Sequence, residues 1–78
     1  MKQPPLVRIT WLDTTGHDGW QDVKSAVKRK PARVRSVGYL LAELDDRVII
    51  CQDLILADKS AHGVGVYPRG MVESIEYL

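Results

Sequence analysis

Hydrophobic residues are concentrated in the stretch 32–57, where two β-prone runs rich in Val, Ile, Leu and Tyr flank the acidic pair Asp45-Asp46. A polar pair between two such runs is typical of a β-hairpin turn. Gly38 interrupts the first run, and a glycine inside a strand indicates a bend or the close approach of another backbone. We therefore expect a long, bent β-hairpin at the centre of the fold.

Alternation elsewhere predicts further strands around this hairpin. In the first of them, Val7, Ile9 and Trp11 share one face, which is the expected core face. Asp53 predicts a bulge or bend late in the third strand, and the polar residues 57–63 predict a loop after it. The predicted strands occupy residues 6–13, 33–44, 47–56, 64–67 and 71–78.

The segment 19–29 has helical spacing instead, because Trp20, Val23 and Val27 fall on one stripe. Asp18 precedes it as the expected N-cap. We expect a helix of two to three turns whose apolar stripe packs against the sheet. Both tryptophans are then core residues that join helix and sheet.

This element order predicts a mainly β fold, a five-stranded SH3-like or Sm-like small barrel with one short helix between strands one and two. A single domain would span residues 1–78. Its first five residues, which contain Pro4-Pro5, would form a loose lead-in. The alternative is an open α+β sheet that carries the helix on one face.

Composition narrows the compartment and the class of protein. Cys51 is the only cysteine among 78 residues, so no internal disulfide can form and a reducing cytoplasm is expected. No apolar stretch approaches the ~20 residues of a membrane span. The N-terminus also lacks the apolar segment of a signal peptide, so no membrane partner is expected. A barrel this small with exposed edge strands is also a candidate homo-oligomer.

Six segments carry a family resemblance. They are Trp-x-Asp at 11–13, Trp20, Arg-Ser-Val-Gly-Tyr-Leu-Leu at 35–41, the acidic turn Asp45-Asp46, Val-Ile-Ile at 48–50 and Tyr-Pro-Arg-Gly-Met-Val-x-Ser-Ile at 67–75. With this pattern over nearly its whole length, the chain resembles short proteins encoded by tailed bacteriophages and prophages. The resemblance implies a cytosolic product of an infected or lysogenic bacterium and brings no assigned activity with it.

At fewer positions the chain is similar to Sm-like proteins. Gly38, Leu40 and Asp45-Asp46 stand roughly where the first Sm motif has a Gly, apolar residues and an acid, and Arg69-Gly70 followed by Ile75 is similar to the second. The Sm helix precedes the first strand, whereas the predicted helix here follows it. The chain contains no Asn, so the base-binding Asn of that family is missing.

The basic run 24–35 holds six cations and no acid. On a helix end and the adjoining strand, such cations could contact phosphates while an aromatic ring stacks on a base. The alternative is a solvated surface that complements the helix dipole and blocks edge-to-edge aggregation. The candidate nucleic-acid-binding residues are Lys28, Arg29, Lys30, Arg33, Arg35 and Tyr39.

No pattern indicates an enzyme, a metal site or a cofactor. The groups His17, Asp18, Cys51, Asp58 and His62 contain no pair at metal-ligand spacing. Asp58, Ser60 and His62 alternate within a predicted loop, which does not pre-organise a nucleophile and its base.

We therefore predict a phage-type accessory protein that acts as a non-enzymatic protein-binding module, with a phage or host protein as its partner. The contact would involve a barrel edge or self-association. The alternative is a nucleic-acid-binding small barrel that uses the basic run. The two hypotheses differ in whether the basic side chains converge on one face or lie among acids.

Overall fold

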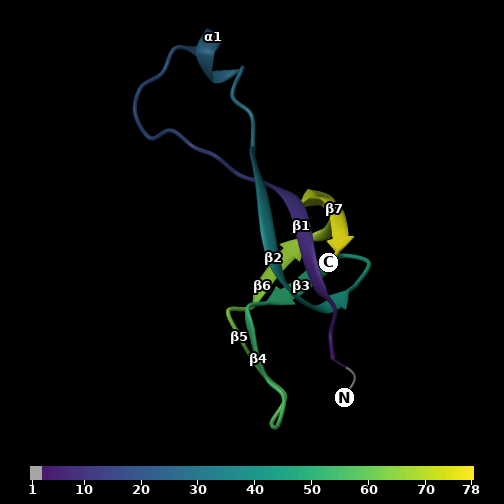
Figure 1. Ribbon diagram of the computed structural model, residues 1–78. Helices are drawn as coiled ribbons and strands as arrows, with labels where there is room; N and C mark the ends of the chain where they lie inside the picture. The colour runs from purple at the N-terminus through teal and green to yellow at the C-terminus, as the bar shows by residue number, and fades with distance from the viewer. Residues whose placement is uncertain (1–2) are drawn as a thin grey trace.

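The computed structural model describes residues 3–78 (Figure 1). It is mainly β, with one short α-helix, as the sequence predicts. The elements in chain order are β1 Leu6–Asp13, α1 Val23–Ala26, β2 Ala32–Glu43, β3 Arg47–Cys51, β4 Asp53–Ile55, β5 Ser60–His62, β6 Gly65–Pro68, the 3₁₀ turn η1 Arg69–Met71 and β7 Val72–Tyr77.

Five strands form one antiparallel sheet in the order β6-β3-β2-β1-β7, and β4 and β5 form a separate two-stranded hairpin. The longest ladder joins β1 to β2, from the pair Leu6–Tyr39 to the pair Asp13–Ala32. Within residues 3–78 no ladder joins β6 to β7, so backbone pairing does not close the sheet into a barrel. Pro5, in the predicted loose lead-in, accepts a hydrogen bond from the Leu40 amide at 2.9 Å; residues 1–2 of that lead-in lie outside the described residues.

The core lies on one face of this sheet. Val7 and Ile9 of β1 and Val48 and Ile50 of β3 are fully buried, which confirms the predicted core face of the first strand. Trp11, on the same face, meets Tyr67 of β6 edge to face at a centroid distance of 4.9 Å. Two strands separate β1 from β6 in the sheet, so this contact requires the sheet to curl around its core.

Gly38 allows this curl. A Cβ at this position would lie 2.6 Å from the carbonyl oxygen of Cys51, so only glycine lets the two backbones approach so closely. The register between β2 and β3 shifts between Leu40 and Ala42, just beyond this point. The predicted bend is therefore confirmed.

The predicted third strand, 47–56, is wrong in its second half. It breaks at Gln52, and β4 leaves the sheet to pair with β5, which occupies part of the predicted loop 57–63. The turn between them closes because Asp58 accepts a hydrogen bond from the Ser60 amide and Lys59 adopts a positive φ of 59°. Short polar side chains stabilise such turns locally, so the hairpin (residues 53–62) forms outside the sheet.

The helix prediction is also wrong in extent and position. The helix spans only Val23–Ala26, and its N-cap is Asp22, whose carboxylate accepts from the Ser25 amide at 3.0 Å. None of its residues is buried, and Trp20 is fully exposed rather than part of the core. Short helices are marginal in water without tertiary packing, so the absence of contacts to the sheet explains the missing turns.

Residues 14–31, here called the arm, project from one end of the sheet, and the hairpin projects from the other end (Figure 1). The chain measures 54 × 21 × 21 Å, and its radius of gyration is 16.2 Å. A compact domain of this length has a radius of about 11.5 Å. The accessible surface is 5940 Å², against about 4,800 Å² for a compact monomer of this mass. Surface that a compact fold would bury is therefore exposed.

Candidate functional site

The arm exposes the apolar stripe that the sequence assigned to the core. Trp20 is fully exposed, and Val23 and Val27 are each about three-quarters exposed, at 76% and 74%. Hydrogen bonds tie the two limbs of the arm together near its base, from the Thr15 hydroxyl to the Lys30 carbonyl and from the Arg29 guanidinium to the Gly16 carbonyl. Adjacent exposed apolar side chains on a structured segment mark an interaction site.

The structure divides the predicted basic site between two regions. Lys28, Arg29 and Lys30 lie on the arm, whereas Arg33 and Arg35 lie on the outer face of β2, exposed between half-buried neighbours. The arm also contains Lys24. Within residues 3–78, no ion pair involves its three lysines, Lys24, Lys28 and Lys30.

The cations of β2 lie among acids of β7. Arg33 pairs with Glu73 at 3.2 Å, and Arg8 of β1 pairs with Glu76 at 2.6 Å. The hydrogen bond and the charge of Arg8 lower the pKa of Glu76, and the charge of Arg35 adds to this effect. The outer face of the sheet is therefore a mixed-charge surface, and the cations outside ion pairs within residues 3–78 include the lysines of the arm.

Tyr39, the sixth candidate residue, lies apart from both groups. It pairs with Leu6 at the opposite end of β1 from the arm. There it lines an open pocket of about 240 Å³ between the sheet and the hairpin. The pocket is lined by Gln3, Tyr39, Gln52, Asp53, Leu54 and Leu56.

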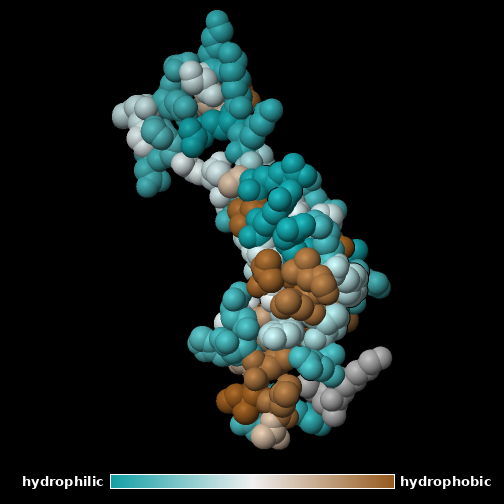
Figure 2. Space-filling model, viewed as in Figure 1, coloured by the Kyte–Doolittle hydropathy of each residue, from teal (hydrophilic) through white to brown (hydrophobic). Residues whose placement is uncertain are grey.

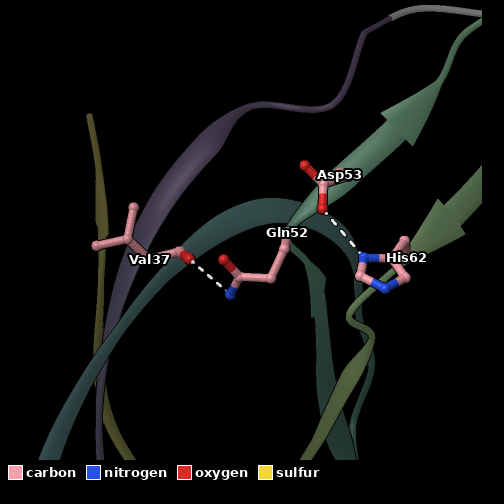
Figure 3. A network of polar contacts seen from close by, with 4 residues as sticks. All are labelled: Val37, Gln52, Asp53 and His62. Atoms are coloured by element: carbon pink, nitrogen blue, oxygen red, sulfur yellow. Dashed lines mark hydrogen bonds and ion pairs between the residues drawn. The ribbon is translucent and has the colours of Figure 1, made fainter.

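Two side-chain contacts lie beside this pocket, at the junction between the sheet and the hairpin (Figure 3). The Gln52 amide donates to the Val37 carbonyl at 3.3 Å, and the His62 ring lies 3.1 Å from the Asp53 carboxylate across β4 and β5. The Asp53–His62 pair is mostly exposed. Ser60 contributes its amide to Asp58 rather than a hydroxyl to His62. The pocket therefore combines the polar side chains of Gln3, Gln52 and Asp53 with three less polar ones, and Asp53 supplies a carboxylate.

Two further kinds of site, a metal-binding cluster and a membrane-spanning helix, are absent from residues 3–78. Over residues 3–78, no three His, Cys, Asp or Glu side chains gather closely enough to bind a metal ion. The helices found in this range lack the length and apolar character needed to cross a bilayer.

Cys51 lies close to the pocket but beneath the sheet surface. Its side chain is fully buried, and burial raises the pKa of its thiol, with the negative charge of Asp53 adding to the effect. The neutral thiol is therefore the native form. Because the pKa of the Cys51 thiol is higher in the folded chain than in the unfolded chain, the protonated thiol favours the folded state. This stabilisation is present below the unfolded pKa of about 8.5 and is lost as pH rises through the folded value.

We expect Cys51 to react with an aromatic disulfide reagent at pH 8 about 100-fold or more slowly in the native protein than in urea, because it reacts only through opening of the fold. A Ser74→Cys/Cys51→Ala variant provides the exposed thiol as a control. Equal native rates for the two thiols would contradict the buried position.

Sequence reasoning missed two features of this surface. The exposure of Trp20 had one signal, since eighteen residues separate β1 from β2 where a hairpin needs only a few. The pocket had a weaker signal in the apolar run 54–56, which continues after the polar residues Gln52 and Asp53.

The comparisons with known proteins assign no function to the chain, so a functional assignment depends on the geometric features described above. No protein-family model, no curated protein and no solved structure matches the chain.

Proposed function

We propose that the chain is a non-enzymatic protein-binding module whose binding surface is the arm. The observation that carries this proposal is the exposure of three apolar side chains, Trp20, Val23 and Val27, on a segment that projects from the sheet. Tryptophan is enriched among the residues that dominate binding energy in protein interfaces. An unpartnered tryptophan on a projecting arm is therefore suited to anchoring a protein partner.

The proposal includes the finer fold, an SH3-like or Sm-like small barrel in a phage-type accessory protein of the bacterial cytoplasm. The antiparallel strand order β6-β3-β2-β1-β7, in which β1 pairs with both β2 and the last strand β7, supports it, as does the 3₁₀ turn before β7. The curl that brings Trp11 onto Tyr67 also favours a barrel-like sheet. The sequence resemblance to phage and prophage proteins supports the cellular setting.

The chemistry of the arm indicates the chemistry of its partner. The arm contains four cations, Lys24, Lys28, Arg29 and Lys30, and two acids, Asp18 and Asp22. Asp22 is already engaged as the N-cap of α1. A complementary partner has an apolar cavity for the indole and a carboxylate at its edge.

A photo-reactive benzoylphenylalanine in place of Trp20 tests this surface in bacterial cells that express the chain. We expect protein adducts on illumination, and we expect Val23→Asp/Val27→Asp in the same chain to reduce them at least about tenfold by removing the apolar contact. The same photo-reactive residue at Ser74, exposed on the sheet, is the control. Equal adduct yields at positions 20 and 74 would contradict the proposal.

Nucleic-acid binding is the second candidate, favoured by the unpaired lysines beside the exposed indole. An aromatic ring with nearby cations is the chemistry that binds single strands. Under this hypothesis, the adducts at position 20 are sensitive to nuclease. The anisotropy of a labelled oligonucleotide would then show binding that persists at physiological salt and is lost with Lys28→Glu/Lys30→Glu.

A further inference from the structure

The arm and the pocket lie at opposite ends of the same chain. The arm follows Asp13, which pairs with Ala32, whereas Tyr39 pairs with Leu6 at the other end of β1. Seven residues of extended strand separate these positions by about 23 Å. Figure 1 shows the arm directed away from the hairpin, so Trp20 cannot reach the pocket of its own chain.

The pocket has the size of a single large side chain. Its volume of about 240 Å³ is below the range of about 300–1,000 Å³ that small-molecule sites occupy. Tyr39, Leu54 and Leu56 supply its apolar lining, and Asp53 supplies a carboxylate. Figure 2 shows apolar side chains gathered over the hairpin end, whereas the arm end is mainly polar.

We propose that Trp20 of one copy inserts into the Tyr39–Leu54–Leu56 pocket of a second copy, so that the chain assembles head to tail. This inference rests on the proposed role of the arm as a protein-binding surface and names its partner. The two surfaces in the contact differ, which makes the interface heterologous. Repeating it generates a ring if the rotation closes and a filament if it does not.

Charge complementarity supports this partner. The arm carries two more cations than acids, whereas the hairpin contributes Asp53 and Asp58 against the single cation Lys59. The Asp53 carboxylate lies at the pocket itself. Lys24 and Lys28 of the incoming arm would therefore meet an acidic edge, which favours this orientation over an arm-to-arm contact between like charges.

The exposed area also matches what such a contact needs. The surface exceeds that of a compact monomer by about 1,200 Å², and a stable interface buries about 800 Å² on each partner. Ile55 of the hairpin and Val64 just after it are further exposed apolar side chains.

Two variants with complementary defects test the assembly. Trp20→Ala removes the anchor and leaves the pocket intact, whereas Leu56→Lys blocks the pocket and leaves the anchor intact; both positions are exposed, so the fold tolerates the changes. In sedimentation of nucleic-acid-free protein, we expect the mass of the wild type to rise above the monomer with concentration. Each variant alone should associate at least about 30-fold more weakly.

The mixture of the two variants gives the deciding result. One intact anchor and one intact pocket remain, so the head-to-tail contact predicts a 1:1 dimer that grows no further. Val66→Lys, at an exposed apolar position outside the pocket, is the matched control and should assemble like the wild type.

Three results would overturn the inference. They are a wild type that stays monomeric at every concentration, assembly that requires added nucleic acid, and variants that remain monomeric when mixed although the wild type associates. A monomeric wild type with protein adducts at position 20 overturns the inference and leaves the proposed function standing. Equal adducts at positions 20 and 74 overturn the proposed function itself.

Discussion

Ile9→Ala is expected to remove about 2–5 kcal/mol from the free energy of unfolding, because it empties part of the core and leaves a cavity. Ile9 is fully buried at the centre of β1, between β2 and β7, and packs with Val7, Val48 and Ile50. Few other side chains are fully buried, so the neighbours have little apolar material with which to fill the space. A chain of this length has only about 4–12 kcal/mol of stability, so the substitution removes a large fraction of it.

Urea unfolding followed by circular dichroism measures this loss. Ile55→Ala is the matched control, since the same atoms are removed from a side chain that is 58% exposed on the hairpin. At a concentration where the chain is monomeric, we expect the control to change stability by less than about 0.5 kcal/mol. Equal losses for the two variants would contradict the assignment of the core.

Gly38→Ala is expected to destabilise the chain by an amount near the upper end of the about 1–3 kcal/mol typical of overpacking. The added Cβ would lie 2.6 Å from the Cys51 carbonyl oxygen and 3.3 Å from the Ile50 Cδ1. The nearest atom belongs to the backbone of the neighbouring strand, so no side-chain rotation relieves the clash. The strands must separate where the sheet curls, and the β2–β3 hydrogen bonds weaken with them.

Gly16→Ala, on the arm, is the control for the loss of a glycine. A Cβ there has no atom within 4 Å, so the substitution should be neutral or should stabilise the chain by up to about 1 kcal/mol through the unfolded state. The midpoints of urea unfolding of the two variants should therefore move in different directions or by clearly different amounts. A stability for Gly38→Ala equal to that of the wild type would show that the strands do not approach closely at this position.

The central hairpin illustrates what local patterns can predict. The Asp45-Asp46 turn, the bend at Gly38 and the inward face of Val7, Ile9 and Trp11 all follow from interactions between near neighbours in sequence or from the alternation of a strand. The alternation of Arg33 and Arg35 with half-buried residues was equally predictable. The strand faces depend on a period of two residues, whereas the turn and the bend depend on the Asp and Gly residues at those positions.

The extent and the packing predicted for the helix were wrong, because both depend on contacts with distant segments rather than on near neighbours in sequence. The spacing of Trp20, Val23 and Val27 is that of a buried helical stripe, and the spacing carries no information about whether a sheet lies within reach. Similarly, the run 47–56 has β-forming residues throughout, but the pairing partner changes at Gln52 from a strand of the sheet to β5. The polar turn at Asp58 and Lys59 favours this local pairing with β5, which the apolar content of the run does not reveal.

The sequence by itself determined the mainly β class, the strand faces and the sharp bend at Gly38, because period, glycine and apolar content act over a few residues. Only the tertiary structure decided that Trp20 stands outside the core, that Arg33 is neutralised by Glu73, and that Tyr39 lines a pocket with Leu54 and Leu56. Each of these features joins residues from separate elements. Contacts of this kind depend on how the whole chain curls and on which segments it leaves outside, and no local pattern records that.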